Sequence, residues 1–237
     1  MHAKPDLRVV LKWTITGSGS VIAAVITLDL MTAQIADSLT YADCEFTLVE
    51  RNGDELFSPS EIGLTPVMSS TANYRGFYCQ YSILNNRFCL TKFWVGFDSK
   101  NDLFAKCGKG PRCFGQLPSR DTHHGVDALT DEPVECFGDW YYENFQHEIA
   151  YSGGILVGHD FIRETYVHGG FPRAYQFLTL HELVFDNGEL TSTHDYTPAA
   201  HEFRQRLTKL HAAPVDDVQC WLQNTFSRDY RRNRRNA

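Results

Sequence analysis

Two hairpin signals of the same kind lie about 102 residues apart in this chain of 237 residues. Asn85-Asn86 in the first and Asn187-Gly188 in the second lie between strand-forming stretches. Such dipeptides favour the tight turns that join neighbouring antiparallel strands. Each hairpin follows an apolar stretch and a short helical pattern, which starts at Ser58 in one case and at Asp160 in the other. The order strand, short helix, hairpin predicts an internal repeat, which concerns architecture and says nothing about chemistry.

The predicted fold is α+β and mainly antiparallel β, with two pseudo-repeated strand–helix–hairpin units and C-terminal helices. We expect one unit over residues 31–98 and the other over 141–197, packed within a single β-rich domain over 31–213, because such small units need a covered face. The strands of the first unit are expected at 45–50, 74–84 and 87–97. The second unit is expected to contain strands at 149–157, 175–185 and 189–194 and a helix at 161–168.

Composition and periodicity predict the character of the remaining segments. Residues 1–30 form an N-terminal extension that need not belong to the core. Residues 99–140 are rich in Gly, Pro, Asp and Cys without a steady period, which predicts a long acidic connector. Residues 199–212 place apolar side chains on one helical face. Residues 214–237 should form a short helix and a basic tail.

Charge is unevenly spread over the chain, whose formal net charge is −7. The segment 120–148 contains eight acidic residues and one basic residue. Concentrated negative charge attracts cationic partners, so this segment predicts binding of a basic protein. It disfavours nucleic-acid binding by the folded body, because contact with phosphates needs a positive surface. The arginine-rich tail is most simply a solvated charge run.

Cysteine content and hydropathy predict a cytoplasmic protein. Seven cysteines cannot all pair internally, and their spacing is not that of a disulfide framework. The apolar run at 21–26 is far shorter than the ~20 residues of a membrane helix. Glycine-rich segments lack the spacing of a nucleotide-binding loop, so we expect no cofactor.

Asp160, His168 and His181 are the candidate catalytic residues, because a carboxylate and imidazoles in proximity could form an acid–base pair. A simpler interpretation exists for the first two. Asp160 could cap a helix, and His168 could lie in its last turn, where it favours the helix dipole. In that case a hydrolase or metal-dependent enzyme is not indicated.

Tyrosines suggest a ligand site between the two units. The candidate residues are Tyr74, Arg75, Tyr78 and Tyr81, and the pair 141–142 adds two more tyrosines. Aromatic walls with few polar groups suit small molecules. Alternation along a strand would equally place some of these side chains in the core.

A zinc site is the second possibility for the connector. Cys107, Cys113, His123 and Cys136, with the adjacent His124, carry the thiolate and imidazole groups that zinc prefers. The spacing lacks the close ligand pairs of common structural sites, so ordinary loop residues are the alternative.

Residues 153–162 (GGILVGHDFI), continued by 166–168 and 180–185, resemble a group of uncharacterised bacterial proteins. Residues 69–77 are similar to another segment of that group, and the resemblance covers about residues 31–194. The group has no assigned activity, so the resemblance implies no catalytic residue.

Three functions therefore stand as hypotheses. The first is a non-catalytic intracellular binding or interaction module that meets a basic partner. The second is a small-ligand-binding β protein with a cleft between the repeats. The third is a hydrolase or metal-dependent enzyme.

Overall fold

The structure is a computed structural model that describes residues 32–126, 133–167, 169–207 and 227–230, with only the backbone at 123–126 and 133–137. Its strands are β1 (Ser38–Tyr41), β2 (Cys44–Asn52), β3 (Phe77–Leu84), β4 (Arg87–Val95), β5 (Ser119–Val126), β6 (Pro133–Tyr142), β7 (His147–Glu148), β8 (Gly153–Phe161), β9 (Phe177–Asp186) and β10 (Glu189–Asp195). Its α-helices are α1 (Ser99–Lys106) and α2 (Thr197–Leu207), and short 3₁₀ helices are η2 (Pro59–Ile62), η3 (Arg163–Thr165) and η4 (Ala174–Gln176).

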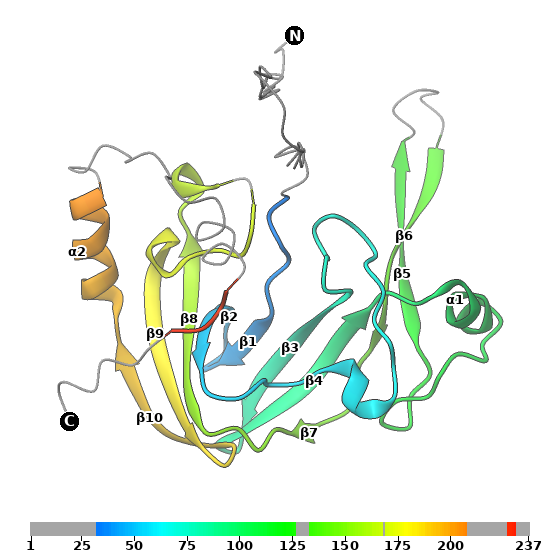
Figure 1. Ribbon diagram of the computed structural model, residues 1–237, viewed down its shortest axis with the longest axis horizontal. Helices are drawn as coiled ribbons and strands as arrows, with labels where there is room; N and C mark the ends of the chain where they lie inside the picture. The colour runs from blue at the N-terminus through cyan, green and yellow to red at the C-terminus, as the bar shows by residue number, and fades with distance from the viewer. Residues whose placement is uncertain (1–31, 127–132, 168, 208–226, 231–237) are drawn as a thin grey trace, which may run out of the picture.

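The described strands form one mixed, mainly antiparallel sheet in the order β10-β9-β8-β2-β1-β3-β4-β6-β5, with β7 beside β4. The pairing of β1 with β3 is parallel. The sheet curves strongly, and β10 meets β4 again where Glu189 lies opposite Arg87. Figure 1 shows the β5–β6 hairpin projecting at one end of this curve and α2 lying beside β10 at the other.

The main core lies on the inner face of the sheet. Alternating side chains of β2, β3, β4, β6, β8 and β9 enter one cluster, which includes Phe77, Phe93 and Ile155. The segment that follows β2 crosses this face and places Phe57 5.5 Å from Phe93, centroid to centroid. Its 3₁₀ helix η2 lies at the short helical pattern predicted from Ser58 and starts with a capping box, in which Ser58 and Glu61 satisfy each other's backbone donors.

Both predicted hairpins are confirmed, as β3–β4 and β9–β10. Two other predictions are wrong. The expected helix at 161–168 is replaced by the end of β8 and the short turn η3, because Asp160 takes a left-handed conformation (φ 59°) within the strand and does not cap a helix. The expected connector 99–140 contains α1, β5 and β6, because Asp98 caps α1 and β6 pairs with the edge of β4.

The two proposed units share an order of elements but differ in pairing. β8 pairs directly with β9, whereas β1 lies between β2 and β3. The units meet where β2 pairs antiparallel with β8. The internal repeat therefore stays a prediction. The helix at 199–212 is observed as α2 over its first part, and the second C-terminal helix falls outside the described residues.

A buried charge cluster lies around Asp37, in the segment before β1. The carboxylate of Asp37 accepts hydrogen bonds from Arg75, from Arg228 (2.8 Å) and from the backbone N–H of Cys79 (2.8 Å). Arg228 belongs to residues 227–230, which pair with Arg51 of β2 through backbone hydrogen bonds. One carboxylate thus connects β3, the segment before β1 and the C-terminal segment.

Candidate functional site

The outer face of β3, β4 and β6 carries a row of aromatic side chains, one from each strand. Tyr78 lies opposite Trp94, which in turn lies opposite Tyr141. The rings of Tyr78 and Trp94 stack with centroids 4.6 Å apart and planes 14° apart, and the Tyr141 ring lies 6.5 Å from that of Trp94. The neighbouring Phe77 and Phe93 point into the core, so the two-residue period of a strand places this row on the opposite face.

One cation lies over this row. The Nζ atom of Lys92 is 4.7 Å from the ring centroid of Trp94 and 3.9 Å from that of Tyr141. The same atom forms an ion pair of 2.9 Å with the Glu143 carboxylate. Cation–π attraction fixes the ammonium group against the rings, so these rings present an electron-rich surface that already holds one cation.

Carboxylates border the row. Burial, Asp139 and Asp121 together raise the pKa of Tyr78 well above its ordinary value. Burial also raises the pKa of Tyr141, as do the charges of Asp121 and Glu143 and a hydrogen bond with Asp121. Both hydroxyl groups therefore stay protonated at neutral pH and can donate hydrogen bonds.

The loop at residues 64–76 is anchored beside these carboxylates. The backbone N–H of Val67 donates to the carbonyl of Gly96 at 2.9 Å. The buried amide of Asn73 donates to the Asp139 carboxylate at 3.0 Å. Because Gly96 after the end of β4 and Asp139 within β6 both hold it, the loop is a fixed border of the aromatic row.

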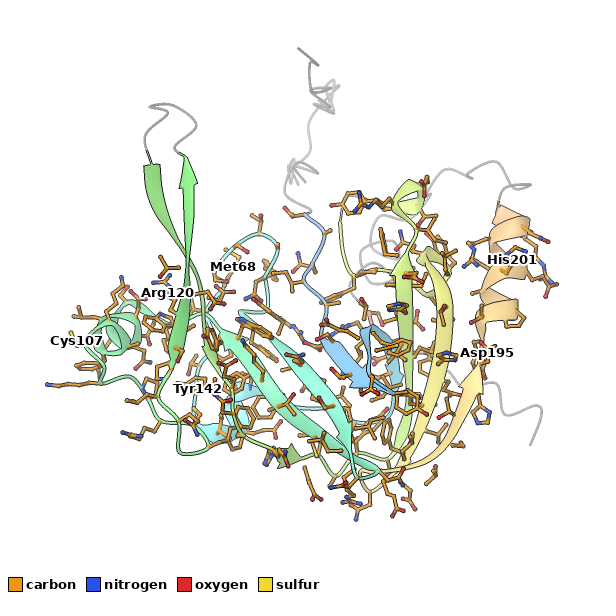
Figure 2. All side chains as sticks on the ribbon, turned by 180° about the vertical axis from the view of Figure 1, so that it is seen from behind. Met68, Cys107, Arg120, Tyr142, Asp195 and His201 are labelled. Carbon is orange, nitrogen blue, oxygen red and sulfur yellow. The ribbon has the colours of Figure 1, made fainter. Side chains whose placement is uncertain are left out.

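This loop exposes apolar side chains next to the row. Met68 is 53% exposed and Tyr74 is 71% exposed. Figure 2 shows Met68 beside the β5–β6 hairpin. We use the name aromatic–acidic face for the following residues together: Met68, Tyr74, Tyr78, Trp94, Asp121, Asp139, Tyr141 and Glu143.

The only basic residue of segment 120–148 does not neutralise this face. Arg120 lies on the same side of the hairpin as Trp140, with its guanidinium 5.2 Å from that ring. Its Nη1 atom is 3.6 Å from the Asp102 carboxylate of α1. The aromatic–acidic face therefore contains three carboxylates beside one ammonium group, that of Lys92.

The structure does not gather the predicted ligand-binding residues into one cleft. Tyr81 is 1% exposed and lies in the core, stacked on Phe88. Arg75 binds the buried Asp37. Tyr74 and Tyr78 belong to the aromatic–acidic face, and the neighbouring Trp94 was not predicted.

The two predicted catalytic residues that are described, Asp160 and His181, contact different partners. The Asp160 carboxylate, 60% exposed, is 3.2 Å from Nε2 of His159. Nδ1 of His181 is 3.7 Å from the carboxylate of Asp195 on β10. His168 lies outside the described residues. Figure 2 shows Asp195 at the end of the sheet opposite the hairpin. Among the described residues, no hydrogen bond or ion pair joins Asp160 directly to His181.

The predicted zinc ligands are only partly described. Cys107 is exposed at the end of α1, and Cys113 is buried. Burial raises the pKa of the Cys113 thiol, which disfavours the thiolate that zinc requires. The side chains of His123 and Cys136 lie outside the described residues. Among the side chains that are described, no three metal-ligating groups gather.

The chain matches no protein-family model, no curated protein and no solved structure. In the described part of the chain, no helix is both long enough and apolar enough to cross a membrane.

Proposed function

We propose that this protein is a non-catalytic binding module that recognises a basic protein through its aromatic–acidic face. The observation that carries the proposal is the row Tyr78, Trp94 and Tyr141, bordered by carboxylates on the outer face of the sheet. Tyrosine, tryptophan and methionine are enriched in protein interfaces and dominate their binding energy.

Charge supports a cationic partner. Three carboxylates border the row, and Lys92, the one cation beside them in the described part of the chain, is paired with Glu143. A surface of this sign accelerates the approach of a basic protein and repels an acidic one. Lysine or arginine side chains of the partner would gain cation–π contacts with the half-buried rings of the row in addition to ion pairs.

The enzyme alternative has less support, because Asp160 and His181 belong to different ion pairs. A ligand cleft between the repeats has less support as well, because Tyr81 is buried in the core. A location in the cytoplasm remains part of our proposal, on the cysteine content of the sequence.

Quantitative affinity capture from cells tests the proposal. One variant combines Asp121→Asn with Glu143→Gln, and a second is Trp94→Ala. The control combines Asp54→Asn with Glu55→Gln, which removes the same charge from exposed positions outside the face. We expect a basic partner to be recovered with wild type and control and lost with both face variants.

The recovered partner then allows affinity and salt dependence to be measured. Removal of a central interface tryptophan costs about 2 kcal/mol or more, which corresponds to ~30-fold weaker binding. The association rate of wild type should fall as salt rises, and that of the charge variant should fall less. Equal recovery by wild type and both face variants would reject the proposed face.

A further inference from the structure

A pocket of about 360 Å³ is lined by Ala33 and by residues within 161–167 and 169–176, on elements that do not belong to the aromatic–acidic face. Since a water molecule occupies roughly 30 Å³ in the liquid, this volume equals about 12 waters and accommodates a ring-sized ligand. Its volume falls in the range of ligand-binding pockets. Aromatic rings and two polar side chains form its walls: Phe161, Tyr166, Phe171, Tyr175, Arg173 and Gln176.

Hydrogen bonds fix the shape of the pocket. The backbone N–H of Ile162 donates to the carbonyl of Gln176 at 2.8 Å, and the buried side chain of Gln176 accepts from the N–H of Arg173 at 2.7 Å. The same side chain donates to the carbonyl of Thr165. The two ends of the segment are thereby held together without a ligand, so the pocket is pre-formed.

The pocket lies against an excess of positive charge. The Phe171 ring separates it from two guanidinium groups, with Cζ of Arg228 at 4.3 Å and Cζ of Arg75 at 5.8 Å from the ring centroid. These two arginines share one carboxylate, that of Asp37. The Nε atoms of both arginines are buried and have no hydrogen-bond partner among the described residues. Within the described part of the chain, one positive charge beside Phe171 is therefore left without a counter-charge.

Arg173 adds a guanidinium in the wall itself. Among the described residues, this group makes one hydrogen bond, from Nη1 to the carbonyl of Ser227 at 3.4 Å. Glu50 opposes its charge: burial raises the pKa of Glu50, and Arg173 lowers it in part. With Glu50 ionised, two carboxylates face three guanidinium groups, which leaves an excess of one positive charge. The carboxylates are those of Asp37 and Glu50, and the guanidinium groups are those of Arg75, Arg173 and Arg228. This excess suits a monoanion.

We propose that this pocket binds a small aromatic carboxylate. The ring of the ligand lies between the aromatic walls, and its carboxylate accepts hydrogen bonds from the guanidinium of Arg173. Guanidinium–carboxylate pairs are frequently bidentate, which gives orientation as well as affinity. The proposal is independent of partner binding at the aromatic–acidic face.

Titration calorimetry of the full chain with phenylacetate and its neutral isostere phenylacetamide tests this site. The two probes differ in charge and little in shape. We expect phenylacetate to bind at least about tenfold more tightly, because a hydrogen bond to a charged group is worth ~1.5–3 kcal/mol. Phenylacetate should also raise the melting temperature, by an amount that grows with the logarithm of its concentration above the Kd.

Three variants locate the binding. In Arg173→Gln, the affinity for phenylacetate should fall to that for phenylacetamide, while the amide binds as before. In Ala33→Phe, a ring added to the pocket lining should abolish binding of both probes. The control Arg163→Gln removes a charge from the same loop, at a residue outside the lining, and should change neither affinity. Melting temperatures without ligand confirm that each variant is folded.

The proposal is overturned if the two probes bind wild type equally or if neither binds at millimolar concentration. It is also overturned if Arg163→Gln weakens phenylacetate as much as Arg173→Gln does, because binding would then reflect overall charge. Retention of binding by a folded Ala33→Phe protein would place the ligand elsewhere.

Discussion

Replacing the buried carboxylate of Asp37 should destabilise the fold strongly. Asp37→Asn leaves Arg75 and Arg228 as two neighbouring cations without a counter-charge. Breaking a buried ion pair by removing one partner costs about 3–5 kcal/mol. We expect the lower end of this range, because the Arg75 side chain is 30% exposed and can regain contact with water.

Urea unfolding at pH 7 measures this cost. A loss of about 3 kcal/mol, at a typical m-value of ~2 kcal/mol/M, lowers the midpoint by roughly 1.5 M. The control is Asp43→Asn, an exposed residue in a turn with positive φ that asparagine tolerates, and it should change stability by less than about 0.5 kcal/mol.

The pH dependence of the difference in unfolding free energy between wild type and Asp37→Asn gives a second test. Burial alone would raise the pKa of Asp37, but Arg75, Arg228 and the N–H of Cys79 lower it below its ordinary value. A carboxyl group with a lowered folded-state pKa stabilises the protein above its unfolded pKa, about 3.9, and loses this effect as pH falls through the folded value. The gap between wild type and Asp37→Asn should therefore stay constant from about pH 7 to 5 and close below about pH 4.

Comparison of the single and double variants of Asp37 and Arg228 tests whether charge causes the loss of stability. Arg228→Met alone should cost less than Asp37→Asn, because the carboxylate keeps Arg75. The double variant should be more stable than Asp37→Asn, since one uncompensated cation has been removed. A cost below about 1 kcal/mol for Asp37→Asn, or additive effects in the double variant, would refute the reasoning.

Three further substitutions have defined outcomes, two in thermal or chemical denaturation and one in partner binding. Gly96→Ala would place a methyl group 2.0 Å from the carbonyl oxygen of Val67, so it should detach the loop 64–76 at a cost of about 1–3 kcal/mol; unchanged stability would contradict this packing. Tyr151→Phe removes a buried hydroxyl that donates to two backbone carbonyls, at 2.8 and 2.9 Å, and should lower the free energy of unfolding by about 1–2 kcal/mol. A loss smaller than that caused by the same substitution at an exposed tyrosine would contradict this. Asn73→Ala breaks the link to Asp139, and we expect its free-energy cost to partner binding to exceed its free-energy cost to folding. Unaltered partner binding would exclude the loop from the interface.

The hairpins could be predicted because their signal is local. Asn85 and Asn86 both take positive φ, as do Asn187 and Gly188, and these residue types favour that conformation. The strand β1 could not be predicted in the same way. It has four residues. Ala42 and Asp43 in its turn both take positive φ, although this dipeptide is not a recognised tight-turn signal.

The hairpin β5–β6 was missed because tertiary pairing decides its structure. Its sequence contains Asp, Gly and Pro, which have low strand preference. The pairing of Trp94 with Tyr141 at the edge of β4 stabilises β6 as a strand. The acidic character of this segment was visible in the sequence, but the strand neighbours that turn it into a surface were not.

The candidate site could be predicted in part for the same reason. Strand alternation separates Tyr78 from the buried Tyr81, but sequence alone does not tell which of the two faces is covered. The contribution of Trp94 depends on the register between β3 and β4. Composition indicated the chemistry of the surface, aromatic and acidic, and the fold determined which residues share it.

Photo-crosslinking tests the proposed binding face most directly. A benzophenone amino acid replaces Tyr74 of the face or, as a control, the similarly exposed Leu178 of β9. We expect irradiation in cells to attach a basic protein to the chain labelled at residue 74 and not to the chain labelled at residue 178. The same crosslinked proteins at both positions, or an acidic protein at residue 74, would contradict the account.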